Sequence, residues 1–185
     1  MRLEELQGEE ELKKARALYE EAFPRAEKKP FELMLEKRDE GSYDMLAIAK
    51  DGEFVGMAFS MRYQEYVLLD YFAIGAGKRG SGLGSRALGL LKERYKEKKL
   101  FLDMETVYED AENGEQRKRR KEFYLRNGMK AMDYIVNPSG VNMEVLTAGA
   151  DISYAEYHGV YEGIFGEEKG KIVKYMGKIE EFKRA

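Results

Sequence analysis

Apolar side chains recur at intervals of three and four along the first part of the chain, a spacing that is typical of helices. One such stripe is ended by Pro24, and a second, shorter stripe begins at Phe31. The positions that make up the two stripes are Leu12, Ala15, Leu18, Tyr19, Ala22 and Phe23, and then Phe31, Leu33, Met34 and Leu35. The pattern therefore predicts two N-terminal helices, each with one buried face.

The period changes to that of strands after residue 42. In "YDMLAIAKDGEFVGMAFSMRYQ", two apolar runs flank Lys50-Asp51-Gly52, and Asp-Gly between such runs is a strong hairpin signal. "YVLLDYFAI" (66–74) and "LFLDMETV" (100–107) are typical of buried strands, and helical spacing fills 83–95 between them. Residues 66–107 are thus expected to form a β-loop-α-β unit with parallel strands and a right-handed crossover.

The remaining chain predicts one more helix, two strands and a C-terminal aromatic helix. "EQRKRRKEFYLRNG" is helical up to Gly128, and strands are expected on both sides of Pro138-Ser139-Gly140. The aromatic residues of the last helix, at intervals of three and four, are expected to cover the sheet or a partner subunit, as in a homodimer; they are Tyr154, Tyr157, Tyr161 and Phe165. The lysine-rich tail from Gly166 is expected to be loosely held.

Composition narrows the function. The chain has 32 basic and 35 acidic side chains in 185 residues, so its net charge of -3 offers no general attraction to nucleic acid or to an anionic membrane. The basic run "EQRKRRK" is interpreted as a solvated helix face. With no cysteine and a single histidine, His158, the chain lacks the residues of common metal sites, so no metal is expected. No long apolar segment is present, which favours the cytoplasm and no membrane.

A glycine-rich stretch, "YFAIGAGKRGSGLGSRALGLL" (71–91), joins the predicted strand to the predicted helix. Glycine permits sharp turns and close approach of a ligand to backbone N–H groups, and a helix N-terminus favours anions, so the stretch predicts a phosphate site. The Walker A pattern is excluded because Ser81 follows Gly80 directly, with no Lys between them. The dinucleotide fingerprint remains open, with Gly82, Gly84, Ala87 and, about twenty residues on, Asp103.

A third interpretation uses more of the chain. Arg79-Gly80-Ser81-Gly82-Leu83-Gly84 matches the (Gln/Arg)-x-x-Gly-x-(Gly/Ala) signature of the GCN5-related N-acetyltransferases, and "EFYLRNGM" resembles that family's Phe-Tyr-x-x-x-Gly segment. The order of elements over residues 3 to 148 is similar as well. One position departs from the family: where an Asn often precedes the Tyr by seven residues, this chain has Arg117.

The resemblance implies an α+β fold with a central mixed, mostly antiparallel sheet, two splayed parallel strands and flanking helices. Residues 1–150 would form the acetyltransferase domain, with 151–185 packed on it. Acetyl-CoA would bind as cosubstrate: backbone groups of Phe72, Ala73 and Ile74 would pair with the pantetheine arm, and a second set would hold the pyrophosphate. That second set is Arg79, Gly80, Ser81, Gly82, Leu83, Gly84 and Ser85.

The resemblance also implies direct acetyl transfer to an amine of a small molecule or peptide. Tyr124 matches the family's general acid. For the general base, alternation places Asp103 and Glu105 on one strand face with Phe101, and Asp70 on the face of Leu68 and Phe72. Glu105, nearest the strand end, ranks first as base, with Asp70 and Asp103 behind it. Two other functions stay open: a nicotinamide dinucleotide-binding oxidoreductase and a non-catalytic acyl-CoA-binding domain.

Overall fold

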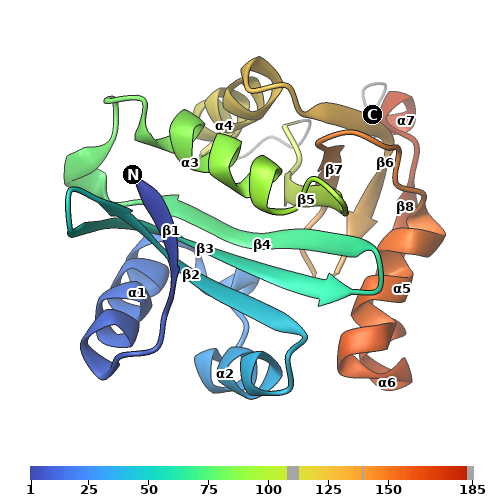
Figure 1. Cartoon of the computed structure of the whole chain (residues 1–185). Helices are drawn as coiled ribbons and strands as arrows, with labels where there is room; N and C mark the ends of the chain where they lie inside the picture. The colour runs from blue at the N-terminus through green and yellow to red at the C-terminus, as the bar shows by residue number, and fades with distance from the viewer. Residues whose placement is uncertain (108–112, 139, 183–185) are drawn as a thin grey trace.

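The computed structural model describes residues 1–107, 113–138 and 140–182, which form one twisted sheet flanked by helices (Figure 1). The strands, in chain order, are β1 (Arg2–Glu5), β2 (Tyr43–Lys50), β3 (Glu53–Tyr63), β4 (Tyr66–Ile74), β5 (Lys99–Glu105), β6 (Lys130–Asn137), β7 (Met143–Thr147) and β8 (Lys174–Gly177). Their order across the sheet is β1-β2-β3-β4-β5-β7-β6-β8. Only β4 and β5 pair in parallel among the described strands. The predicted mixed, mostly antiparallel sheet is confirmed.

Helices cover both faces of the sheet. On one face lie α1 (Glu9–Ala22), α2 (Phe31–Asp39) and α5 (Tyr154–Phe165), and on the other lie α3 (Leu83–Arg94) and α4 (Gly114–Arg126) (Figure 1). Each face has its own buried cluster: Tyr19, Phe59 and Tyr157 belong to the first, and Leu88 and Tyr124 to the second. The helical stripes in the sequence therefore face the sheet, as their spacing predicts.

The predicted turns form where glycine can adopt a left-handed backbone. Asp51 and Gly52 have φ of 52° and 84° in the hairpin between β2 and β3, the conformation for which Asp-Gly is favoured. Gly128 has φ of 76° just after α4 and ends that helix as predicted. The predicted strands on either side of residue 139 are β6 and β7, while Ser139 itself lies outside the described residues.

The two parallel strands separate halfway along their length. Pairing between β4 and β5 runs from Tyr66 with Lys99 to Leu69 with Leu102. Beyond these residues β4 continues only against β3, and β5 only against β7. The backbone edges of β4 and β5 that face one another past this point are therefore available to a ligand, because an unpaired strand edge needs hydrogen-bond partners.

A β-bulge in β4 lies at the point where β4 and β5 separate. Phe59 pairs with Tyr71 and Ser60 pairs with Leu69, so Asp70 is an extra residue with no partner on β3. The bulge reverses the alternation of β4: Leu68 and Tyr71 both belong to the cluster under α1 and α5, whereas Phe72 packs against the cluster under α3. The expectation that Asp70 and Phe72 share a face was therefore wrong, because simple alternation cannot anticipate an inserted residue.

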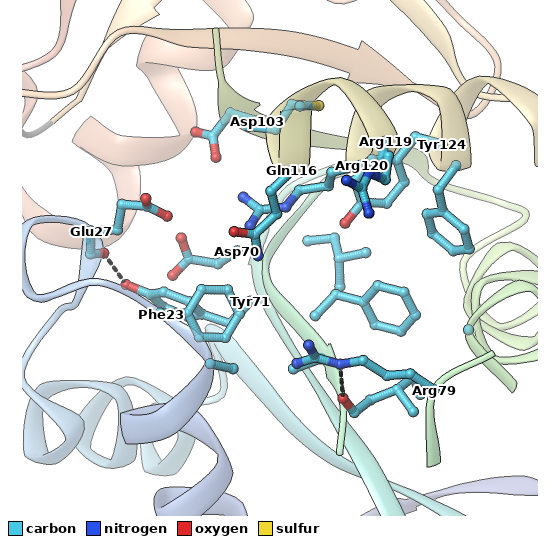
Figure 2. Close-up of a pocket in the computed structure, with 18 of the residues that line it drawn as sticks. Phe23, Glu27, Asp70, Tyr71, Arg79, Asp103, Gln116, Arg119, Arg120 and Tyr124 are labelled. Carbon is cyan, nitrogen blue, oxygen red and sulfur yellow. Dashed lines mark hydrogen bonds between the residues drawn. The ribbon is translucent and has the colours of Figure 1, made fainter. Parts of the chain in front are cut away.

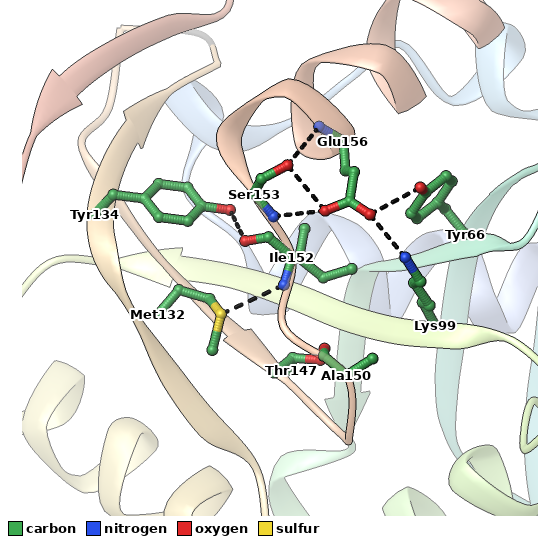
Figure 3. A network of polar contacts seen from close by, with 9 residues as sticks. All are labelled: Tyr66, Lys99, Met132, Tyr134, Thr147, Ala150, Ile152, Ser153 and Glu156. Carbon is green, nitrogen blue, oxygen red and sulfur yellow. Dashed lines mark hydrogen bonds and ion pairs between the residues drawn. The ribbon is translucent and has the colours of Figure 1, made fainter.

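The C-terminal segment is held more firmly than its composition indicates. A capping box joins Ser153 and Glu156 at the start of α5, and Glu156 also accepts hydrogen bonds from Lys99 (2.7 Å) and Tyr66 (2.9 Å) (Figure 3). These bonds, with Lys99 contributing most, lower the pKa of Glu156 to about 2. Helix α5 is thus tied to the starts of both parallel strands, with Tyr157 fully buried against the sheet.

Beyond α5, the chain forms α6 (Glu167–Gly170), β8 and α7 (Ile179–Phe182). Strand β8 pairs with β6 and extends the sheet by one edge strand. The expectation of a loosely held tail was therefore wrong up to residue 182, because backbone pairing with β6 and burial of Val173 and Ile179 anchor it.

Candidate active site

A cavity of about 580 Å³ lies where β4 and β5 separate. Its walls come from the glycine loop and α3, from α4, from the segment between α1 and α2, and from α5. Figure 2 shows Gln116, Arg120 and Tyr124 on one side of the cavity and Glu27, Asp70 and Asp103 on the other. One cavity therefore brings together the glycine loop, Tyr124 and two of the predicted acids, Asp70 and Asp103.

The glycine loop opens α3 with exposed backbone. Gly80 and Gly82 have φ of 79° and 74°, so both need the conformational freedom of glycine, and no atom lies within 4 Å of where a Cβ of either would stand. Gly82 is the N-cap of α3 and makes no side-chain capping bond. Because the first N–H groups of a helix have no partner within it, this end of α3 is suited to a phosphate.

Other residues of the loop hold its shape. Arg79 Nε donates to the carbonyl of Ile74 (3.1 Å), and Ser81 Oγ donates to the carbonyl of Lys78 (2.9 Å). Gly84 brings α3 close to α4, since an added Cβ would lie 3.3 Å from the Phe123 ring. All ten predicted cofactor residues except Ser81 line the cavity.

Tyr124 extends from α4 to the cavity and is 7% exposed. The hydrogen bonds of the described residues include none to its hydroxyl. Burial raises the pKa of Tyr124 to about 12, with Arg120 acting in the opposite direction. The hydroxyl therefore keeps its proton at neutral pH and can donate it to a group in the cavity.

Asp70 reaches the cavity, but both of its oxygens are bonded. Lys29 Nζ lies 2.7 Å from Oδ1, and the Tyr43 hydroxyl donates to Oδ2 at 2.5 Å. The Asp70 side chain is only 4% exposed. Both Asp70 oxygens are therefore already bonded to donors within the protein.

Asp103 also lines the cavity, on the face of β5 that carries Phe101. Its Oδ2 accepts a hydrogen bond from the hydroxyl of Tyr157 on α5. Burial raises the pKa of Asp103 to about 6, although the bond from Tyr157 lowers it. The carboxyl group can therefore exchange a proton close to neutral pH.

Glu27, from η1 (Arg25–Glu27), is a cavity residue that the sequence did not reveal. Its Oε1 is buried and has no hydrogen-bond partner among the described residues. Burial, followed by the negative charges of Glu105 and Asp103, raises the pKa of Glu27 to about 7. It lies in the charged sequence "RAEKKP", which has no periodicity that distinguishes it from a solvated loop.

Glu105, the first-ranked base, lies beside the cavity and is not among its lining residues. Its side chain is 5% exposed and contacts two arginines of α4: Arg117 at 2.7 Å and Arg120 at 3.3 Å. Arg117 also bonds the Thr106 carbonyl and the Asn113 side chain. The family's usual Asn position is thus filled here by an arginine that holds the end of β5.

The comparisons place the chain in a family. The model of the acetyltransferase (GNAT) family matches residues 9–129. A glycine loop before α3, a splayed parallel pair and a tyrosine on α4 are combined in one cavity, and the chain belongs to this family of acetyltransferases. No curated protein matches the chain significantly.

Solved structures share the fold. A structure described as an acetyltransferase of the GNAT family from Bacteroides thetaiotaomicron is 24% identical, with a TM-score of 0.76 over 90% of this chain and 99% of that one. A ribosomal-protein-alanine N-acetyltransferase from Brucella melitensis is 16% identical (TM-score 0.59; 80% and 98% covered). An aminoglycoside 6'-N-acetyltransferase complexed with coenzyme A is 15% identical (TM-score 0.59; 83% and 100% covered).

The described residues contain no group of three or more His, Cys, Asp or Glu side chains placed to hold a metal ion. Within the same residues, no helix has the length and apolar character needed to cross a membrane.

Proposed function

We propose that this protein is an acetyl-CoA-dependent N-acetyltransferase that transfers the acetyl group directly to an amine of a small molecule or peptide. The observation that supports this most strongly is the single cavity in which the uncapped glycine loop, Tyr124 and the carboxyl groups of Glu27 and Asp103 meet. In the same proposal, residues 1–150 form the acetyltransferase domain, residues 151–185 complete it, and the protein works in the cytoplasm.

The residues present fit the cofactor. The open left-handed glycines at 80 and 82 leave room for a pyrophosphate against the backbone of residues 79–85, where the dipole of α3 stabilises negative charge. Arg79 and Lys78 add positive charge at the same end. The unpaired edge of β4 from Phe72 to Ile74 would bond the amide-bearing arm as a further strand would.

Acetyl-CoA supplies the acetyl group as a thioester. We assign the base to Glu27, with Asp103 beside it, in place of the first-ranked Glu105: Glu27 would take the proton that the amine loses as its nitrogen bonds the acetyl carbon. Tyr124 would donate its proton to the sulfur as the carbon–sulfur bond breaks. Glu105 and Asp70 are then positioning residues, since one is paired with arginines and the other with Lys29.

The dinucleotide-binding alternative has less support. That fold needs a parallel sheet with helices on both faces, and the described strands include one parallel pair. Asp103, its proposed ribose ligand, is bonded to Tyr157 beneath α5. Non-catalytic binding of acyl-CoA keeps the same fold and is separated from catalysis by experiment.

A thermal-shift panel with acetyl-CoA, CoA, NAD and NADP tests the cofactor first. A ligand that binds only the native state stabilises it by about 2.7 kcal/mol at a hundredfold excess over its dissociation constant. We expect stabilisation by acetyl-CoA and CoA alone. Release of free CoA is then followed with primary amines and with peptides; binding of acetyl-CoA without CoA release from any acceptor would favour the non-catalytic domain.

A further inference from the structure

The acceptor end of the cavity already contains a cation. Lys29 Nζ lies 2.7 Å from Asp70 Oδ1, 5.3 Å from the centre of the Tyr71 ring and 5.3 Å from the centre of the Tyr161 ring. A carboxylate with two aromatic faces is the arrangement by which proteins recognise ammonium groups. Lys29, Asp70, Tyr71 and Tyr161 all line the cavity, so this site opens into the space that the acceptor would use.

The lysine is held in place from its backbone. The Lys29 N–H donates to the Tyr71 hydroxyl (3.0 Å), and the Tyr19 hydroxyl donates to the Lys29 carbonyl (2.8 Å). Pro30 follows and restricts Lys29 to extended conformations. Its side chain is 20% exposed. Burial acts to lower the pKa of Lys29, but Asp70, Tyr161 and Tyr71 together outweigh it and raise the pKa, so the ammonium keeps its charge.

The acceptor end of the cavity therefore has two acidic sites, and Lys29 occupies the one formed by Asp70. Asp70 is bonded to Lys29 and Tyr43, whereas Glu27 and Asp103 remain to accept an ammonium from a substrate. An acceptor with a second ammonium a few bonds away would need a second carboxylate. The one within the cavity lining that could serve, Asp70, is already neutralised.

We propose that Lys29 sets the acceptor class: its ammonium fills a cation site made by Asp70, Tyr71 and Tyr161, so the cavity takes acceptors with one ammonium and discriminates against diamines. The proposal rests on the N-acetyltransferase function above. Removing the lysine side chain would convert its site into a subsite for the distal ammonium of a diamine.

The test compares n-butylamine with 1,4-diaminobutane on the wild type, Lys29→Ala and Lys29→Ala/Asp70→Asn. Calorimetric titration in the presence of CoA should show that Lys29→Ala raises the preference for the diamine by about tenfold or more, the scale of one desolvated charge pair. The double variant should lose this gain, because the carboxylate that holds the second ammonium is absent. The ratio of kcat/KM for the diamine to kcat/KM for n-butylamine should change in the same way.

Several outcomes would overturn the proposal: an unchanged ratio in Lys29→Ala, an equal change in the double variant, or a wild type that itself prefers the diamine tenfold. The comparison on the wild type needs no variant, so it still tests the proposal if Lys29→Ala does not fold. Lys29→Met removes the charge but still fills the site with a side chain of similar length, so it should gain less of the preference for the diamine than Lys29→Ala. If no amine is acetylated by any variant, the proposed function fails, while the binding ratios still test the cation site.

Discussion

The guanidinium of Arg117 lies 2.7 Å from a carboxylate oxygen of Glu105, with the two side chains 11% and 5% exposed. Arg120 contacts the other carboxylate oxygen at 3.3 Å. Because the pair is buried, removing one partner of such a bridge would cost about 3–5 kcal/mol, and the charge of Glu105 is fixed in place. That fixed charge is also one of the causes that raise the pKa of Glu27.

Glu105→Gln should therefore shift the acidic limb of the pH–rate profile. The substitution keeps the shape and removes the negative charge, so the pKa of Glu27 should fall from its value of about 7. We expect the rise of kcat/KM with pH to begin at lower pH than in the wild type. The profile should be measured with an acceptor whose own ionisation is determined separately.

A matched control is Glu144→Gln, which also removes a fully buried carboxylate, here paired with Lys121 on the same helix as Arg117. It should lose stability without moving the acidic limb. If Glu105→Gln instead abolishes turnover at every pH while acetyl-CoA still binds, Glu105 is the base itself and Glu27 is not.

Glu27→Gln should become more stable than the wild type as the pH rises. The pKa of Glu27 is raised from 4.5 to about 7 on folding, so the favourable protonated form is fully present below pH 4.5 and is lost as the pH rises through 7. The glutamine variant cannot ionise. Denaturant unfolding at pH 4.5 and pH 8 should show a relative gain of about 2–3 kcal/mol for the variant over this interval.

Glu32→Gln provides a control of opposite sign. The pKa of Glu32 is lowered by a hydrogen bond from its own backbone and by Arg16, so the stabilisation by its charge is lost as the pH falls below 4.5 and is constant above it. Relative to the wild type, this variant should gain stability as the pH falls below 4.5 and change little between pH 4.5 and 8. If the free energies of unfolding of the wild type and Glu27→Gln change in parallel between pH 4.5 and 8, folding does not raise the pKa of Glu27.

Much of the fold follows from local patterns. The Asp51-Gly52 turn, the strand spacing and the helical stripes predict the hairpin and the parallel unit because each depends on neighbouring residues alone. The bulge at Asp70 inserts one residue without changing composition, so alternation assigns Phe72 to the wrong face. Strand β8 is four residues of "KYMG", too short for a period, and exists through pairing with β6.

The residues of the candidate site likewise divide into those that local sequence predicts and those that depend on tertiary packing. The glycine loop could be predicted because its function needs a backbone that only glycine adopts, as the positive φ angles of Gly80 and Gly82 show. Glu27 and Lys29 could not, since their place in the cavity depends on how the segment between α1 and α2 packs on Tyr71. Glu105 is near the strand end as expected, yet its side chain meets the arginines of α4.

Ser85→Glu should separate helix stability from cofactor binding. Ser85 is exposed in the first turn of α3, where an acidic side chain stabilises a helix by about 0.3–1 kcal/mol but would repel a pyrophosphate. We expect an equal or higher melting temperature and at least tenfold weaker CoA binding by calorimetry. Gly89→Glu adds the same charge to an open position further along α3 and should leave CoA binding nearly unchanged. If Ser85→Glu and Gly89→Glu weaken CoA binding equally, the glycine loop does not form part of the cofactor site.

Tyr124→Phe distinguishes an enzyme from a domain that only binds acyl-CoA. The substitution removes one hydroxyl, to which no described residue donates or accepts a hydrogen bond, and keeps the ring between α4 and the sheet. Stability should therefore change little. If Tyr124 protonates the departing thiolate, the rate should fall by about 10²-fold or more, the usual scale of general acid catalysis, with CoA affinity nearly unchanged.

The matched control is Tyr134→Phe, whose hydroxyl donates to the Ile152 carbonyl at 2.8 Å and does not line the cavity. It should show the reverse pattern, a lower melting temperature of the protein with wild-type turnover, because it loses a buried hydrogen bond and no catalytic group. Steady-state release of CoA and melting curves should be measured for the wild type, Tyr124→Phe and Tyr134→Phe. Equal turnover by the wild type and Tyr124→Phe would leave Tyr124 as a core aromatic and require another proton donor to the thiolate.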